Sequence, residues 1–137
     1  MELYISLSGG GTKGAYQIGF LKGLKEELEK NKLLDNIKIT RLAGISVGAL
    51  NAAFLAQFEN FWEGVEEAWK IWKNFKASLK DKIKLLLGYY EPPVHYITKP
   101  PVIECYIECV SMRTGEKKIF SLNLINDVKE IKKIVQA

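Results

Sequence analysis

A serine lies between two glycines in the segment LAGISVGALNA, residues 42–52, at the spacing Gly44-x-Ser46-x-Gly48. This spacing is typical of a nucleophile elbow, in which a strained strand-to-helix turn lifts a serine hydroxyl above the end of a sheet. Side chains at the glycine positions would collide across the turn, so glycine suits both. Ser46 is therefore a candidate nucleophile for acyl transfer. A second interpretation is a helix that begins with Ser46 as its N-cap.

A glycine-rich loop, SGGGTKG at residues 8–14, follows an apolar run and precedes a helical pattern. A phosphate-binding P-loop is excluded, because it needs Lys and then Ser or Thr after the last glycine, and Ala15 follows Gly14. The dinucleotide fingerprint Gly-x-Gly-x-x-Gly is present. The acid expected at the end of the next strand is missing, however, since Thr40 and Arg41 stand there. The loop is a poor match to a nucleotide site.

Backbone amides offer a third interpretation of this loop. Consecutive glycines at Gly9, Gly10 and Gly11 let N–H groups approach a developing negative oxygen, and the helix N-terminus adds partial positive charge. The loop would then be an oxyanion hole. The alternative is a tight strand-to-helix turn without chemistry.

A catalytic serine also needs a base, because a free hydroxyl is almost never ionised at neutral pH. A triad would have to use His95, the one histidine, and the order Ser46, Asp81, His95 is that of α/β-hydrolases. That fold needs several strands before its elbow, and here two fit. Of the other aspartates, Asp35 is expected in a loop and Asp127 at a helix start. We expect none of these groups to be the base.

Hydrophobic periodicity indicates the elements that position the two turns. Strands are expected at residues 2–7 and 36–40, helices at 15–30 and 49–58, and a turn over 42–48. Sequential parallel strands usually lie side by side, so the glycine loop and the serine turn should meet at one sheet edge. Farther along we expect an amphipathic helix over 58–79 that breaks near Gly64 or Ser78, and then a loop over 88–101. A strand over 102–112 should form a hairpin with a strand at 117–122. A last helix should be capped by Asn126 or Asp127.

Composition places the chain among globular proteins. Its 137 residues are 47% hydrophobic with a net charge of +4, which suits one α/β domain over residues 1–137 and no nucleic-acid partner.

Cys105 and Cys109 would share one side of a strand as buried thiols rather than form a disulfide or metal site. No signal or bilayer-spanning segment is evident. A cytoplasmic location is the default expectation, with peripheral membrane binding or export without a cleaved signal as alternatives.

Residues 62–84 combine tryptophans with lysines. Between Lys70 and Lys84 there are six lysines and one aspartate. Tryptophan is favoured at headgroup depth and lysine near anionic lipid, so this segment is a candidate for contact with a membrane surface. The competing interpretation is that the tryptophans belong to the core and the lysines are solvated.

The segments LSGGGTKGAYQIGFLKGLKEE and ITRLAGISVGALNAAFLA resemble the two N-terminal motifs of patatin-like phospholipases. The likeness implies a lipid acyl hydrolase on a mostly parallel sheet with helices on both faces. Ser46 would attack a phospholipid or other lipid ester, and Gly9, Gly10 and Gly11 would supply the oxyanion N–H groups. Lys13 would occupy the basic position of the family, next to Gly14. No metal and no organic cofactor is implied.

The family's base is an aspartate in an Asp-Gly motif, which this sequence lacks. Asp35, Asp81 and Asp127 do not precede glycine. We therefore expect the chain to be the N-terminal portion of such a domain, or to receive its base from a second chain. The alternative is a non-catalytic relative that binds lipid or a partner.

Overall fold

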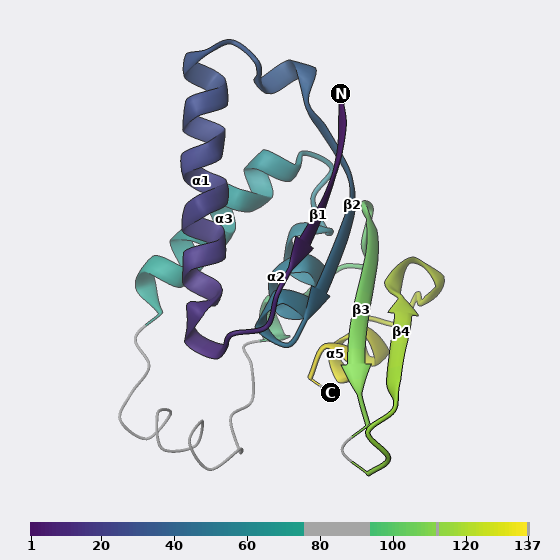
Figure 1. Cartoon of the computed structure of the whole chain (residues 1–137). Helices are drawn as coiled ribbons and strands as arrows, with labels where there is room; N and C mark the ends of the chain where they lie inside the picture. Colours follow the sequence, from purple (N-terminus) through teal and green to yellow (C-terminus); the bar gives the residue numbers. More distant parts are fainter. Residues whose placement is uncertain (76–93, 112, 137) are drawn as a thin grey trace.

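The structure is a computed structural model that describes residues 1–75, 94–111 and 113–136, apart from the side chain of Thr12 (Figure 1). Within these residues one sheet contains the strands β1 (Glu2–Leu7), β2 (Lys38–Ile45), β3 (Glu104–Val110) and β4 (Lys117–Ser121), in the order β1-β2-β3-β4. The first three are parallel, and β4 is antiparallel to β3. The α/β class and the mostly parallel sheet are confirmed.

The strand register brings the two turns of interest to one edge. Leu7 of β1 lies opposite Gly44 of β2, and Ile45 of β2 lies opposite Glu108 of β3. The carboxyl ends of the parallel strands are thus aligned. The loop after Leu7 and the turn after Ile45 consequently leave the sheet next to each other.

The helices connect and cover these strands. The α-helices among the described residues are α1 (Gly14–Lys30), α2 (Val47–Leu55), α3 (Phe61–Asn74) and α5 (Val128–Gln136), and the short 3-10 helices are η1 (Gly11–Lys13), η2 (Leu34–Asn36), η3 (Val94–Tyr96) and η4 (Leu122–Leu124). Helix α2 contacts β1, β2 and β3, and it also contacts α1, α3 and α5. Its sequence, VGALNAAFL, is rich in small residues and buried over most of its length, because neighbours pack on all sides.

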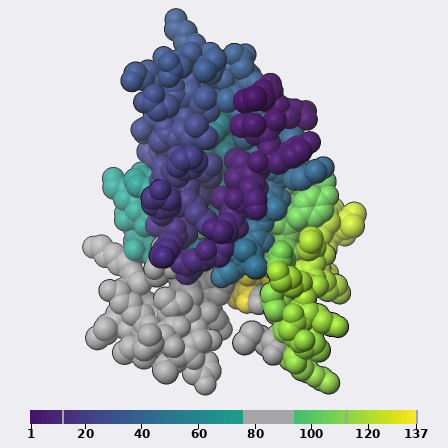
Figure 2. All heavy atoms as spheres, in the orientation of Figure 1, coloured from purple at the N-terminus to yellow at the C-terminus, as the bar shows by residue number. Residues whose placement is uncertain are grey.

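The helices that the structure describes cover one face of the sheet. Helices α2 and α5 contact the strands, α3 packs on α2, and α1 packs mainly on α3. In the view of Figures 1 and 2 these elements lie behind or beside the strands, and β1 and β4 form part of the near surface. Tyr4 and Ile119 on this open face are 63% and 67% exposed. The expected second layer of helices is therefore not found among these residues.

Polar side chains make the open face compatible with water. Nε of Arg41 donates to Oε2 of Glu104 at 2.8 Å, and the guanidinium lies 4.7 Å from the centre of the Tyr4 ring. A strand buried on both faces would be almost continuously apolar, whereas Arg41 and Glu104 alternate with the buried Leu42 and Cys105. This alternation is the sequence signal for a half-covered sheet.

The extents of several elements differ from expectation, most clearly those of β2 and α3. Strand β2 runs to Ile45, so most of the segment expected to be a turn is strand, and Ser46 alone makes the turn. Helix α3 continues through Gly64, where we expected a break. A Cβ on Gly64 would lie 2.9 Å from Cδ2 of Phe58, so the glycine makes room for that ring. Ser78 lies outside the described residues.

The tryptophans of α3 pack against the rest of the fold. Trp62 is 7% exposed and Trp69 and Trp72 are half-buried, whereas Lys70 and Lys73 are exposed. The described part of the segment 62–84 thus follows the core interpretation, and membrane contact stays a prediction. Among the described residues, no helix combines the length and apolar character needed to span a bilayer.

The two thiols should differ from unfolded cysteine in reactivity. Burial raises the pKa of Cys105 to about 12 and, together with the charge of Glu108, raises the pKa of Cys109. Since the thiolate is the nucleophile, native Cys105 should react with iodoacetamide at pH 8 roughly 1000-fold more slowly than the unfolded chain. Peptide mass spectrometry after timed labelling measures both rates. Equal rates would contradict the burial of β3.

Candidate active site

Ser46 forms the turn between β2 and α2 in a backbone conformation that L-residues rarely adopt. Its φ is 55° and its ψ is −126°, which costs a non-glycine residue on the order of 1–3 kcal/mol. Ser46 is exposed and occupies the N-cap position of α2, yet its hydroxyl makes no capping hydrogen bond. The helix-cap interpretation is therefore not supported, and the hydroxyl is accessible to a ligand.

The glycines that flank Ser46 are required by backbone packing. A Cβ on Gly44 would lie 2.2 Å from the carbonyl oxygen of Gly48, and a Cβ on Gly48 would lie 2.0 Å from the carbonyl oxygen of Leu7. Both distances are far below contact, and the obstructing atoms are backbone. Any side chain at Gly44 or Gly48 would push α2 away from the ends of β1 and β2.

The glycine loop lies against the serine turn. A Cβ on Gly9 would lie 3.3 Å from Cβ of Ser46 and 3.9 Å from its Oγ. Gly9, Gly10 and Gly11 are exposed, and Gly11 has a φ of 55° that favours glycine. Among the described residues, their amide hydrogens have no hydrogen-bond acceptor. Gly9 is the member of this loop that lies beside the exposed hydroxyl, and unused N–H groups in such a place are what oxyanion stabilisation needs.

Two helices begin beside this loop. The amide of Lys13 donates to the carbonyl of Gly10 at 3.1 Å, and the exposed Lys13 directly precedes α1. Gly14 is buried at the start of α1, where a Cβ would lie 2.4 Å from Cγ2 of Val47 and 2.9 Å from Cζ2 of Trp72. The N-termini of α1 and α2 are therefore in contact, and their partial positive charges lie near Ser46.

None of the described titratable side chains is hydrogen-bonded to Ser46. His95 is exposed in η3 with its ring 4.1 Å from that of Tyr96. Asp35 lies in η2 at the amino end of β2, the end away from Ser46, and Asp127 caps α5 by accepting from the amide of Lys129 at 2.9 Å. Asp81 lies outside the described residues. Within the described part, no group of three His, Cys, Asp or Glu side chains could hold a metal.

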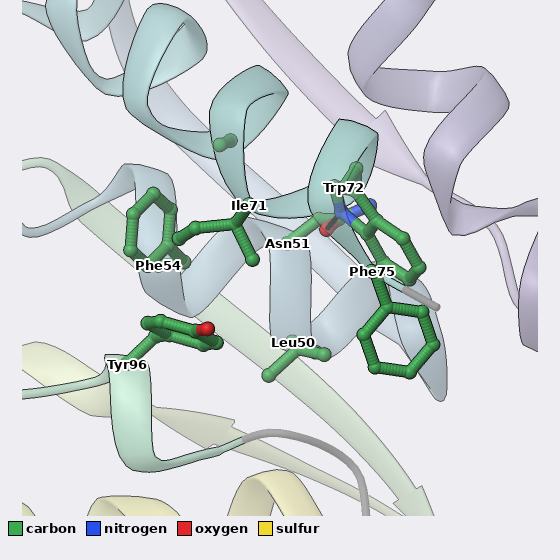
Figure 3. Close-up of a pocket in the computed structure, with 8 residues that line it drawn as sticks. Leu50, Asn51, Phe54, Ile71, Trp72, Phe75 and Tyr96 are labelled. Carbon is green, nitrogen blue, oxygen red and sulfur yellow. Dashed lines mark hydrogen bonds between the residues drawn. The ribbon is translucent and has the colours of Figure 1, made fainter. Parts of the chain in front are cut away.

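A small apolar pocket lies between α2, α3 and η3 (Figure 3). Its walls include Leu50, Phe54, Ile71, Phe75 and Tyr96, and its volume is about 20 Å³. The amide of Leu50 donates to the carbonyl of Ser46, so the pocket begins one helical turn beyond the serine. This volume suits about one water molecule. As the pocket stands, it does not accommodate an acyl chain.

Sequence reasoning overlooked two amide side chains near the loop. Asn51 is 3% exposed in the middle of the apolar helix α2, and it is hydrogen-bonded to Gln17 of α1 and Trp72 of α3. Figure 3 shows Asn51 and Trp72 adjacent at one end of the pocket. A single asparagine within an apolar helix was the available signal, because a buried amide requires partners.

Because α2 lies so close to β1, a side chain at position 48 should destabilise the protein. Gly48→Ala should lower the free energy of unfolding by about 2–4 kcal/mol, because the added methyl meets the backbone of Leu7. Gly23→Ala in α1 is the matched control. Nothing lies within 4 Å of its new methyl, so stability should rise by about 0.5–1 kcal/mol. Urea unfolding measures both, and equal effects would contradict the packing.

Comparison with known proteins gives this arrangement a family context. The family model described as patatin-like phospholipase matches residues 5–136, which is nearly the whole chain. No curated protein gives a significant match to the sequence. With the mostly parallel sheet, the glycine loop and the serine turn in place, the match shows that this chain belongs to the patatin-like phospholipase family.

Proposed function

We propose that this protein hydrolyses lipid acyl esters, with Ser46 as the nucleophile and the loop Gly9–Gly11 as the oxyanion hole. The family supports lipid acyl hydrolysis in general. The finer proposal rests on one observation: Ser46 is exposed and uncapped, and its Oγ lies 3.9 Å from the Cβ position of Gly9. A carbonyl carbon at Ser46 would thus have its oxygen close to the loop.

The proposed chemistry proceeds through an acyl-enzyme. Oγ of Ser46 bonds to the ester carbonyl carbon and loses its proton to a base, while the carbonyl π electrons move onto oxygen. Amide hydrogens of the loop and the start of α2 stabilise that negative oxygen. Collapse expels the alcohol, which takes up the proton. Water then attacks the acyl-Ser46 ester by the same steps and releases the fatty acid.

The base comes from outside the described residues in this proposal. Asp35 is at the wrong end of β2, and Asp127 is used as a helix cap. A carboxylate must therefore come from elsewhere in the protein or from a second chain. The absence of an Asp-Gly motif from the sequence favours a second candidate function, a non-catalytic protein that binds lipid or a partner at the same turn.

A fluorophosphonate probe tests whether Ser46 is an activated nucleophile. The wild-type protein should be labelled on Ser46, and Ser46→Ala should reduce labelling at least 100-fold, because the nucleophile is lost. Intact mass and peptide mapping measure this. Ser8→Ala is the control, since Ser8 is a serine that directly precedes the loop glycines, and it should retain labelling.

Two outcomes separate the candidate functions. If folded wild-type protein stays unlabelled while it binds phospholipid vesicles, the hydrolase proposal is wrong and the binding function is favoured. Labelling that persists in Ser46→Ala would likewise remove Ser46 from the proposal.

A further inference from the structure

The side chain of Asn51 joins three helices beneath the serine turn. Its Nδ2 donates to the carbonyl of Gly14 at 3.1 Å and to Oε1 of Gln17 at 2.9 Å. Its Oδ1 accepts from Nε1 of Trp72 at 3.0 Å. The residue is 3% exposed. Both N–H donors of Nδ2 are therefore used by acceptors inside the protein.

The orientation of both side-chain amides is fixed by partners that can only donate or can only accept a hydrogen bond. The indole N–H of Trp72 can only donate, so Oδ1 of Asn51 must face it. The carbonyl of Ser8 can only accept, so the group of Gln17 that lies 2.6 Å away must be Nε2. Oε1 of Gln17 is then directed to Asn51. The hydrogen bonds consequently run in one direction and are mutually consistent.

These bonds reach both ends of the glycine loop. Gln17 holds the carbonyl of Ser8, just before the loop, and Asn51 holds both Gln17 and the carbonyl of Gly14, just after it. Asn51 lies in α2, the helix that starts directly after Ser46. One helix therefore carries the turn with the hydroxyl and, through two side chains, the ends of the loop.

We propose that Asn51 and Gln17 form an amide clamp that positions the Gly9–Gly11 loop relative to Ser46. Both are positioning residues, since neither contacts the site where a substrate carbonyl would lie. The catalytic part of this inference rests on the proposed function. The structural part, that the clamp keeps the loop closed, stands on the hydrogen bonds alone.

The loop depends on such support because glycine has little conformational preference of its own. A segment with three consecutive glycines samples many backbone states, and fixing them carries a large entropic cost. Among the described residues, the backbone bonds of the loop itself connect Lys13 to Gly10 and Gly14 to Gly11. Anchoring at Ser8 and Gly14 restricts the residues between them. A displacement of about 1 Å in such donors can reduce a rate by roughly 100-fold.

Gln17→Met is the decisive variant. Gln17 is half-buried, so methionine retains its packing and removes only the amide. The matched control is Gln57→Met. Gln57 is equally an amide with internal partners, accepting from the backbone amides of Thr98 and Lys99 at 2.7 and 2.9 Å, but it lies just beyond the far end of α2.

The first readout needs no catalysis. Trypsin should cut the Lys13–Gly14 bond about tenfold faster in Gln17→Met than in wild type, because loss of one anchoring bond opens the loop more often. In Gln57→Met the rate at this bond should stay within about twofold of wild type. Timed digestion with mass spectrometry gives the rates. An unchanged rate in Gln17→Met would overturn the clamp.

The second readout is hydrolysis of p-nitrophenyl butyrate. Gln17→Met should lower kcat about 10- to 100-fold with KM within about twofold, since the loop acts on the transition state. Gln57→Met should keep the wild-type kcat. A kcat in Gln17→Met equal to wild type would overturn the positioning role. Faster cleavage at Lys13 together with an inactive wild type supports the clamp and counts against the proposed function.

Discussion

The first turn of α2 packs directly on the backbone at the end of β1. The position of Ser46 relative to the glycine loop depends on this contact. Gly48 has no side chain, and the carbonyl of Leu7 fills the space where one would be. Because backbone meets backbone, α2 crosses the strand ends at the smallest available distance. The position of Ser46 next to the loop is therefore fixed by backbone atoms, which cannot move aside. A side chain in the same place could change its rotamer.

Much of the framework followed from sequence because parallel topology is restrictive. Two strands joined by one helix are expected to be neighbours, so the loop after the first and the turn after the second had to share an edge. The end of β2 was harder. Ala43 and Gly44 look like turn residues, and they are held in a strand by pairing with β1 on one side and β3 on the other. Such pairing is a tertiary effect that local preference does not encode.

The candidate site divides in a similar way. Ser46 and the three loop glycines have a local signature, because strain and close approach select particular residue types at fixed spacing. Asn51 and Gln17 have none, since their partners are distant in sequence and meet only when α1 and α2 pack. The uncovered face of the sheet could have been inferred from Arg41 and Glu104. Glu104 falls within the expected strand 102–112, and a charged side chain in a strand indicates a face that is open to water.

Strand β4 bears on how another chain could approach this protein. It is short, runs antiparallel to β3, and carries Lys117 and Lys118 at its beginning. Lysines on a short edge strand discourage further strands from adding, because incoming backbone would have to bury or displace ammonium groups. Extension of the sheet past β4 is thus disfavoured. A carboxylate that acts on Ser46 would have to reach the carboxyl ends of the parallel strands, where Ser46 follows β2.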